Sequence, residues 1–213
     1  MSNYKTVFFI LGVLQIILGL SMIVPIMAQF YYNQVDSGFI GSGLVSIIFG
    51  VLFFLSNLDY EKKLTLPQAF LLTALSWLSI AIFGSLPFVF SDLSLSFTNA
   101  FFESMSGITT TGSTILTNLN ETPKAILLWR AMLQWLGGIG IIVMAITLMP
   151  IMNIGGMQLF MISTSNTPEK ILPKSKEISI RLILVYLTLT IACAVFYKIF
   201  GMGFFDSIVH SMT

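Results

Sequence analysis

The sequence predicts an all-α polytopic membrane protein: a leading helical hairpin, then repeats of a span, a short pore helix, a filter loop and a second span. Composition is the first reason, because 56% of the 213 residues are hydrophobic and 9% are charged, whereas soluble proteins average about 25% charged residues. Five long apolar runs are the second reason, since a helix of about 20 residues crosses a bilayer. The third is a run of hydroxyl residues at 109–113 that interrupts this apolar pattern.

The first two apolar runs are expected to form a transmembrane hairpin over residues 1–57. The first run covers about residues 7–30, which is longer than the core of a secretory signal peptide, and Pro25 should kink it near its far end. A polar turn separates it from the second run, residues 39–55. Small residues let helices approach closely in lipid, and the second run carries three glycines: Gly41, Gly43 and Gly50.

Residues 66–152 are expected to form one complete pore repeat. Apolar spans cover 66–90 and 124–149, and between them lies a polar segment with a short helical pattern over 97–107. That helix is far too short to cross a bilayer. Irregular backbone at membrane depth is tolerated only inside protein or along a water-filled path. We therefore predict that residues 109–113 form a filter loop rather than an ordinary polar turn.

The end of the chain repeats the short helical segment. Three pairs of residues are related by a constant offset of 107 positions: Phe97 with Phe204, Asn99 with Asp206, and Ser104 with Ser211. We therefore expect residues 177–213 to begin a second repeat, after a cytoplasmic loop at 153–176. Because several loops are needed to surround an ion, the chain is expected to be an amino-terminal fragment with about one and a third of four repeats.

The placement of lysine and arginine predicts the orientation in the membrane. Alternating spans put ten basic residues on two sides: Lys5, Lys62, Lys63, Lys170, Lys174, Lys176 and Arg181 on one, and Lys124, Arg130 and Lys198 on the other. The richer side should be the cytoplasm, so the amino terminus is expected inside and the threonine loop outside. A net charge of +1 leaves no basic surface for nucleic acid.

The threonine loop has the chemistry to bind a dehydrated potassium ion. Four backbone carbonyls could replace part of the hydration shell, namely those of Thr110, Thr111, Gly112 and Ser113. We expect K⁺ itself at the first three of these. Gly112 permits backbone angles that a side chain forbids, and the negative dipole end of the short helix faces the ion. Thr109 and Glu103 are expected to support the loop.

Other polar residues lead to weaker predictions. Glu103 and its repeat counterpart His210 could tune the outer vestibule or bond behind the filter, and the second role is favoured. Arg130 is expected to snorkel outward, or to pair with a carboxylate such as Glu121. The glycines at 137–140 are expected to pack helices. The sequence contains no Ser/His/Asp or metal-ligand cluster, so an enzyme is not expected.

Residues 101–114 resemble the first pore loop of the TrkH branch of the Trk/Ktr/HKT potassium transporter superfamily. Further stretches resemble the same family in the same order: residues 123–130, 134–143, 155–159 and 206–211. The resemblance covers essentially the whole chain, and the two extra leading spans are similar to the TrkH branch rather than to the KtrB branch. Serine at the position of Gly112 accompanies Na⁺ preference in plant members, so glycine implies K⁺.

The resemblance implies four span–pore-helix–span repeats around one ion path. It also implies potassium uptake across the cell membrane, driven by the membrane potential, with K⁺ as substrate and no covalently bound cofactor. The implied partners are a TrkA-like cytosolic nucleotide-binding regulatory subunit and a second copy of the protein, in a homodimer. Two alternatives stay open: a Na⁺-permeable or poorly selective transporter of this family, and a non-conducting membrane assembly or regulatory subunit.

Overall fold

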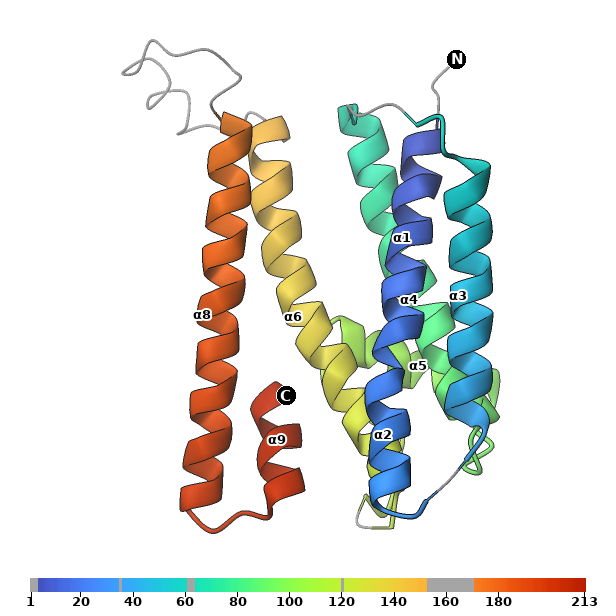
Figure 1. Ribbon diagram of the computed structural model, residues 1–213, viewed down its shortest axis with the longest axis vertical. Coiled ribbons are helices and arrows are strands. Elements are labelled where there is room, and N and C mark those ends of the chain that lie inside the picture. The colour runs from blue at the N-terminus through green and yellow to red at the C-terminus, as the bar shows by residue number, and fades with distance from the viewer. Residues whose placement is uncertain (1–3, 35, 61–63, 120, 153–170) are drawn as a thin grey trace. The chain divides into compact units, whose positions relative to one another are not determined.

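The computed structural model describes residues 4–34, 36–60, 64–119, 121–152 and 171–213, and every regular element among them is an α-helix (Figure 1). The helices are α1 (Lys5–Ser21), α2 (Ile23–Tyr31), α3 (Gly38–Ser56), α4 (Leu66–Phe90), α5 (Phe97–Ile108), α6 (Lys124–Met152), α8 (Ile171–Ile199) and α9 (Phe204–Met212). The all-α class is therefore confirmed. The chain divides into two compact units, Met1–Gly137 with Thr213, and Gly138–Met212.

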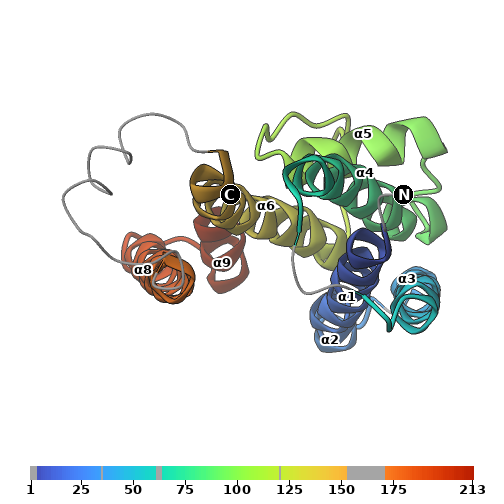
Figure 2. The same cartoon turned by 90° about the horizontal axis from the view of Figure 1, so that it is seen from above.

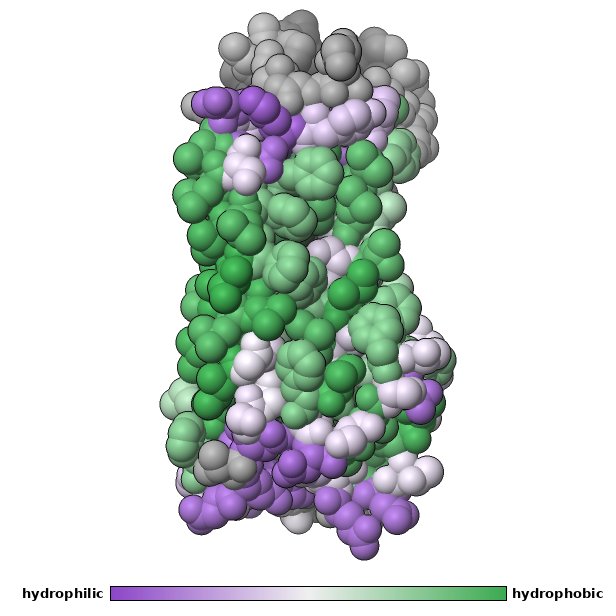
Figure 3. All heavy atoms as spheres, turned by 90° about the vertical axis from the view of Figure 1, so that its right-hand side faces the viewer, coloured by the Kyte–Doolittle hydropathy of each residue, from purple (hydrophilic) through white to green (hydrophobic). Residues whose placement is uncertain are grey.

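Five helical segments of the described residues are long and apolar enough to cross a membrane. They are Lys5–Tyr31, Gly38–Ser56, Leu66–Phe90, Lys124–Ile142 and Ile180–Ile199. Large apolar side chains are exposed on them, as in the stripe along α3 formed by Ile40, Leu44, Ile48, Leu52 and Leu55. Figure 3 shows a broad apolar belt with polar side chains at both ends. The chain is thus a multi-pass membrane protein whose apolar surface suits lipid.

The first membrane-crossing segment is broken at Met22, between α1 and α2. Pro25 lies three residues further on and has no N–H for the helical ladder, and its ring crowds the carbonyl of Ser21. The Met22 N–H instead bonds to the Gly19 carbonyl at 3.3 Å, which tightens the last turn of α1. The kink expected at Pro25 therefore lies about one turn earlier, beside the Ser21 carbonyl that Pro25 cannot bond.

Facing glycines close the leading hairpin between α1 and α3. A Cβ on Gly12 would lie 2.7 Å from the Gly50 carbonyl oxygen, and a Cβ on Gly19 would lie 2.9 Å from that of Gly43. The two backbones therefore touch, as close-packed helices in lipid do. Gly43 and Gly50 serve the packing role expected of them, whereas Gly41 does not, because a Cβ there would meet a single atom 3.9 Å away.

Helix α5 lies across the long helices of the first unit and packs against α4 (Figure 2). Two local signals set these elements. At the start of α4, the Thr65 N–H donates to the Gln68 side chain at 2.9 Å in a capping box. At the start of α5, the Ser96 hydroxyl accepts the Asn99 N–H at 3.4 Å. The short helix thereby begins at Phe97, where the sequence pattern predicts it.

In the second unit, α8 leads through a turn at Gly201, whose φ is +97°, into α9. Helix α9 begins at Phe204, 107 positions after the start of α5, so the sequence offset reappears as a structural one. Residues 153–170 of the loop expected at 153–176 lie outside the described residues. The last six residues of that expected loop, 171–176, belong to α8 instead. Pro173 falls in the first turn of α8, where proline is tolerated.

Candidate functional site

The threonine loop, residues 109–113, follows the carboxyl end of α5 directly, and its N–H groups turn back onto that helix. Four consecutive N–H groups donate to helix-end carbonyls: Thr109 to Met105 at 3.0 Å, Thr110 to Gly107 at 2.9 Å, Thr111 to Ser106 at 3.0 Å, and Gly112 to Ser106 at 3.3 Å. The carbonyls that a helix end normally leaves open are thereby bonded within the chain.

The bonds from Thr110 and Thr111 form a Schellman motif, which requires a left-handed residue just past the helix. That position falls on Thr110, with φ of +58°. Glycine is usual there, and a β-branched residue is rare, at a cost of roughly 1–2 kcal/mol. Gly112 is the second left-handed residue, with φ of +76°. Strain of this kind persists where the surroundings impose it, and it gathers at functional sites.

This pattern fixes where the loop carbonyls point. In a trans peptide the C=O is directed opposite to the N–H of the next residue. Because the N–H groups of Thr110, Thr111 and Gly112 face the helix end, the three preceding carbonyls, those of Thr109, Thr110 and Thr111, face away from it. None of these three carbonyls accepts a hydrogen bond within the described parts of the chain. The loop thus presents successive open acceptors on one side.

The remaining two carbonyls of the predicted site have protein donors. The Gly112 carbonyl lies 3.4 Å from Nη2 of Arg130, and the Ser113 carbonyl accepts the Ser106 hydroxyl at 2.6 Å. Each oxygen keeps a second lone pair, since a carbonyl can accept two hydrogen bonds. Of the four predicted carbonyls, those of Thr110 and Thr111 therefore accept no hydrogen bond within the described residues, whereas those of Gly112 and Ser113 each have a protein donor.

The threonine hydroxyls hold the beginning of the loop. The hydroxyl of Thr109 bonds to the Met105 carbonyl at 2.7 Å, and it lies 2.9 Å from the hydroxyl of Thr111. Local bonds of this kind compete with continuation of the helix. The hydroxyls of Thr109 and Thr111 are thus occupied with the end of α5 and with one another.

Glu103 lies on the buried face of α5 behind the loop and is 1% exposed. One carboxylate oxygen accepts the N–H of Ile115 at 3.1 Å, and the other forms an ion pair with Nε of Arg130. Glu103 thus ties α5, the segment after the loop and α6 together.

The outward path expected for Arg130 is wrong, because its side chain is only 15% exposed. The alternative, pairing with a carboxylate, is confirmed, but the carboxylate is that of Glu103 rather than Glu121. The physical reason is that a guanidinium held among apolar helices needs a counter-charge within reach, and the nearest buried carboxylate is supplied by α5. Arg130 also contacts the Gly112 carbonyl, so one side chain links the ion pair to the loop.

The first half of α6 packs against both α4 and α5. The indole N–H of buried Trp129 donates to the Gly84 carbonyl on α4 at 2.9 Å. One turn on, Leu133 fills the space at two glycines: a Cβ on Gly84 would lie 3.2 Å from it, and a Cβ on Gly107 would lie 3.0 Å from it. The loop is therefore attached to a packed three-helix platform.

Gly137 on α6 touches the backbone at the end of α5. A Cβ at this position would overlap the Ile108 carbonyl oxygen and lie 2.7 Å from the carbonyl carbon. The role expected of the 137–140 glycines, close helix packing, therefore holds for Gly137. Near the loop, Gln134 places its amide nitrogen 3.0 Å from where a Cβ on Gly112 would stand.

Ser106 is a residue of this site that sequence reasoning missed. Its only signal is position, since it is the last hydroxyl inside α5 and lies seven residues before Ser113. His210, the repeat counterpart of Glu103, belongs to the second unit. There its Nδ1 lies 2.9 Å from the Asp206 carbonyl, and its ring lies 6.4 Å from that of Tyr197.

Two serines of α5, two positions apart and so on different faces of the helix, test the support of the loop. Ser106→Ala should destabilise the purified full-length protein by about 0.5–1.5 kcal/mol, because it removes the bond to the Ser113 carbonyl. Ser104 is the matched control, since its buried hydroxyl has no partner among the described residues. Ser104→Ala should be neutral or stabilising. Thermal unfolding in detergent measures both, and an equal loss in both variants would contradict the assignment.

Comparisons with known proteins agree with this architecture. The family model described as TrkH, cation transport protein, matches residues 6–212. The Trk system potassium uptake protein TrkH of Vibrio parahaemolyticus is 37% identical over 99% of this chain and 44% of its own length. That of Escherichia coli K12 is 38% identical over 98% and 44%. TrkI, the Trk system potassium uptake protein of Halomonas elongata, is 38% identical over 96% and 42%.

The fold is also found in a solved structure. The crystal structure of the potassium transporter TrkH from Vibrio parahaemolyticus has a TM-score of 0.86 and 36% identity, covering 99% of this chain and 42% of that one. The chain thus spans about 44% of the length of the first of these relatives. With its leading hairpin, crosswise short helix and threonine loop, the chain belongs to the TrkH family of cation transport proteins.

Proposed function

We propose that the full-length protein containing this chain takes up potassium ions, and that Thr110, Thr111, Gly112 and Ser113 supply one part of its selectivity filter. The observation that carries the proposal is the one-sided loop, in which bonded N–H groups leave successive carbonyls facing away from α5. A dehydrated cation needs such a row of oxygens in place of its water. The relatives named potassium uptake proteins support K⁺ as the cation.

In this proposal the ion is held by dipoles rather than by a carboxylate. The open carbonyls of Thr110 and Thr111 face K⁺, and those of Gly112 and Ser113 use their second lone pair. The carboxyl end of α5 adds the negative end of a helix dipole. Glu103 supports the loop from behind, and its charge is balanced by Arg130. Entry of K⁺ is driven by the membrane potential, about 2.3 kcal/mol per charge per 100 mV.

One loop cannot surround an ion, so the proposal assigns this chain a share of a larger pore. Residues 66–152 form the first pore repeat, and residues 177–213 begin the second. Further loops of the full-length protein complete the ring of carbonyls. The membrane is the cell membrane, with the amino terminus in the cytoplasm, because basic residues gather on that side. A TrkA-like nucleotide-binding subunit on the cytosolic face and a second copy of the protein complete the assembly.

Gly112→Ser in the full-length protein tests the filter assignment. The φ of +76° is unfavourable for serine, so the carbonyls of Thr111 and Gly112 should turn and fit K⁺ less well. We expect the K⁺ over Na⁺ uptake ratio to fall about tenfold, which corresponds to roughly 1.4 kcal/mol of discrimination. Uptake of Rb⁺ and ²²Na⁺ by proteoliposomes measures this ratio.

Gly41→Ser is the matched control, because Gly41 lies on α3 with open space around its Cβ position. The control should leave the uptake ratio unchanged. An unchanged ratio in Gly112→Ser would show that the loop does not select the ion. Equal K⁺ and Na⁺ uptake by the unaltered protein would favour a poorly selective transporter, and the absence of any uptake would favour a non-conducting assembly.

A further inference from the structure

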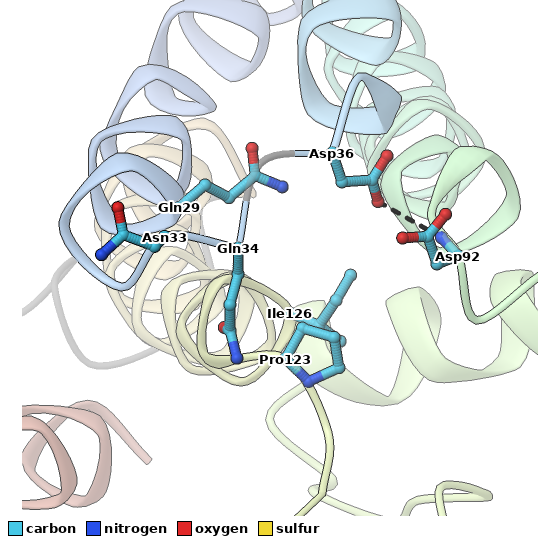
Figure 4. Close-up of a pocket in the computed structure, with 7 residues that line it drawn as sticks. All are labelled: Gln29, Asn33, Gln34, Asp36, Asp92, Pro123 and Ile126. Carbon is cyan, nitrogen blue, oxygen red and sulfur yellow. Dashed lines mark hydrogen bonds between the residues drawn. The ribbon is translucent and has the colours of Figure 1, made fainter.

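A polar pocket of about 300 Å³ lies at one end of the first unit, and no residue of the threonine loop lines it (Figure 4). Three segments meet around it: the turn after α2, the end of α4 and the start of α6. The residues that line it are Gln29, Asn33, Gln34, Asp36, Asp92, Pro123 and Ile126. Five of them carry carboxylates or amides, and the described lining includes no lysine, arginine or histidine.

Two carboxylates face this pocket, and neither forms an ion pair with a lysine, arginine or histidine of the described residues. Asp36 accepts the N–H of Gly38 at 2.8 Å through one oxygen, and the N–H of Asp92 at 3.2 Å through the other. That second bond holds the Asp36 carboxylate beside the backbone of Asp92. The carboxylate of Asp92 itself is exposed and accepts no hydrogen bond within the described residues. Two like charges on one pocket wall repel each other, and a cation between them would remove that repulsion.

Gln29 is an independent sign that the pocket binds something. Its side chain comes from α2 and is only 4% exposed, and its amide has no hydrogen bond within the described residues. Figure 4 shows the amide extending from α2 toward Asp36. The residue lines the pocket, so its amide can reach a ligand held beside Asp36. A bound cation would give the amide oxygen a partner and neutralise both acids.

The donor set selects the kind of ion. Carboxylate and amide oxygens are ligands for hard cations, and Ca²⁺ accepts six to eight oxygens in flexible geometry, several of them from water. Two carboxylates balance one divalent charge, whereas a monovalent ion would leave net negative charge in the pocket. We propose that this pocket binds one divalent cation of the Ca²⁺ type through Asp36, Asp92 and Gln29, with water completing the shell.

Such an ion would link α2 and the turn after it, which carry Gln29 and Asp36, to Asp92 just after α4. The same turn already touches the start of α6 through the Lys124 N–H, which donates to the Gln34 side chain at 3.1 Å. Binding should therefore stabilise the first unit against unfolding. The site uses none of the threonine-loop residues. A failure of this proposal would therefore leave the proposed ion filter unaffected, and a failure of the filter would leave this site unaffected.

The test is Ca²⁺ titration of the full-length protein, freed of divalent ions with a chelator and kept at constant K⁺. Calorimetry should show one saturable site with a Kd of about 10⁻⁴–10⁻³ M, the range of open sites of this type. Saturating Ca²⁺ should raise the Tm. Asp92→Asn should weaken binding about tenfold or more, because ligand charge sets the affinity. Asp59→Asn, an exposed aspartate outside the pocket, should bind as the unaltered protein does.

Gln29→Met keeps the shape of the side chain and removes the amide, so it provides a second variant if Asp92→Asn fails to fold. It should leave the Tm of the ion-free protein nearly unchanged, since the amide makes no hydrogen bond within the described residues, and it should reduce the Ca²⁺-dependent rise. Absence of saturable Ca²⁺ binding would overturn the proposal. So would equal binding by Asp92→Asn and Asp59→Asn, or the same Tm rise from K⁺ alone.

Discussion

Arg130→Ala should destabilise the full-length protein by about 3–5 kcal/mol, the usual cost of breaking a buried ion pair from one side. The variant leaves Glu103 charged, 1% exposed and without its counter-ion. It also removes the contact with the Gly112 carbonyl. We therefore expect a large fall in Tm in detergent, together with loss of K⁺ uptake at temperatures where the protein is still folded.

The matched control is Arg181→Ala on α8. Arg181 pairs with Glu177 at 2.6 Å, but both side chains are mostly exposed, at 75% and 63%, and exposed pairs contribute about 0–1 kcal/mol. A double variant, Arg130→Met with Glu103→Gln, should recover much of the lost stability, because it removes the unpaired charge. Equal Tm changes in Arg130→Ala and Arg181→Ala would contradict the buried pair.

Gly137→Ala is the second large effect. Even a methyl group at this position overlaps the Ile108 carbonyl oxygen, and backbone cannot move aside as a side chain can. We expect a loss of more than about 3 kcal/mol, above the usual range for overpacking. Because Ile108 is the last residue of α5, the displacement should also disturb the Schellman motif that sets the loop.

Gly140→Ala separates this contact from the general effect of placing alanine in α6. A Cβ on Gly140 would meet nothing within 4 Å, and alanine favours helix over glycine by about 1 kcal/mol. The control should therefore keep or raise the Tm. Comparable destabilisation in both variants would show that the close approach to Ile108 is not what Gly137 provides.

The elements of the fold were predictable because their signals are local. Apolar runs set the spans, a serine before Phe97 caps α5, and the same pattern 107 positions later marks α9. The glycine contacts of the hairpin could be predicted from the sequence only in part. Gly43 and Gly50 are seven residues apart, two helical turns, and so share one face. Gly41 falls on another face, which the earlier expectation ignored.

The interior of the candidate site was not predictable in the same way. Which carboxylate Arg130 meets depends on how α5 crosses α6, and no spacing along the chain encodes that angle. The left-handed Thr110 also gave no signal, because threonine disfavours the conformation that the hydrogen bonds of the Schellman motif require. The bond between Ser106 and Ser113 follows from that same turn.

Locating the ion tests the central claim most directly. Full-length protein crystallised with Tl⁺ in place of K⁺ should show anomalous peaks within coordination distance of the Thr110 and Thr111 carbonyl oxygens, which face away from α5. Gly112→Ser should weaken those peaks, while Gly41→Ser should not. A row of ions that bypasses these carbonyls, or peaks confined to carboxylates such as Glu103, would contradict the account.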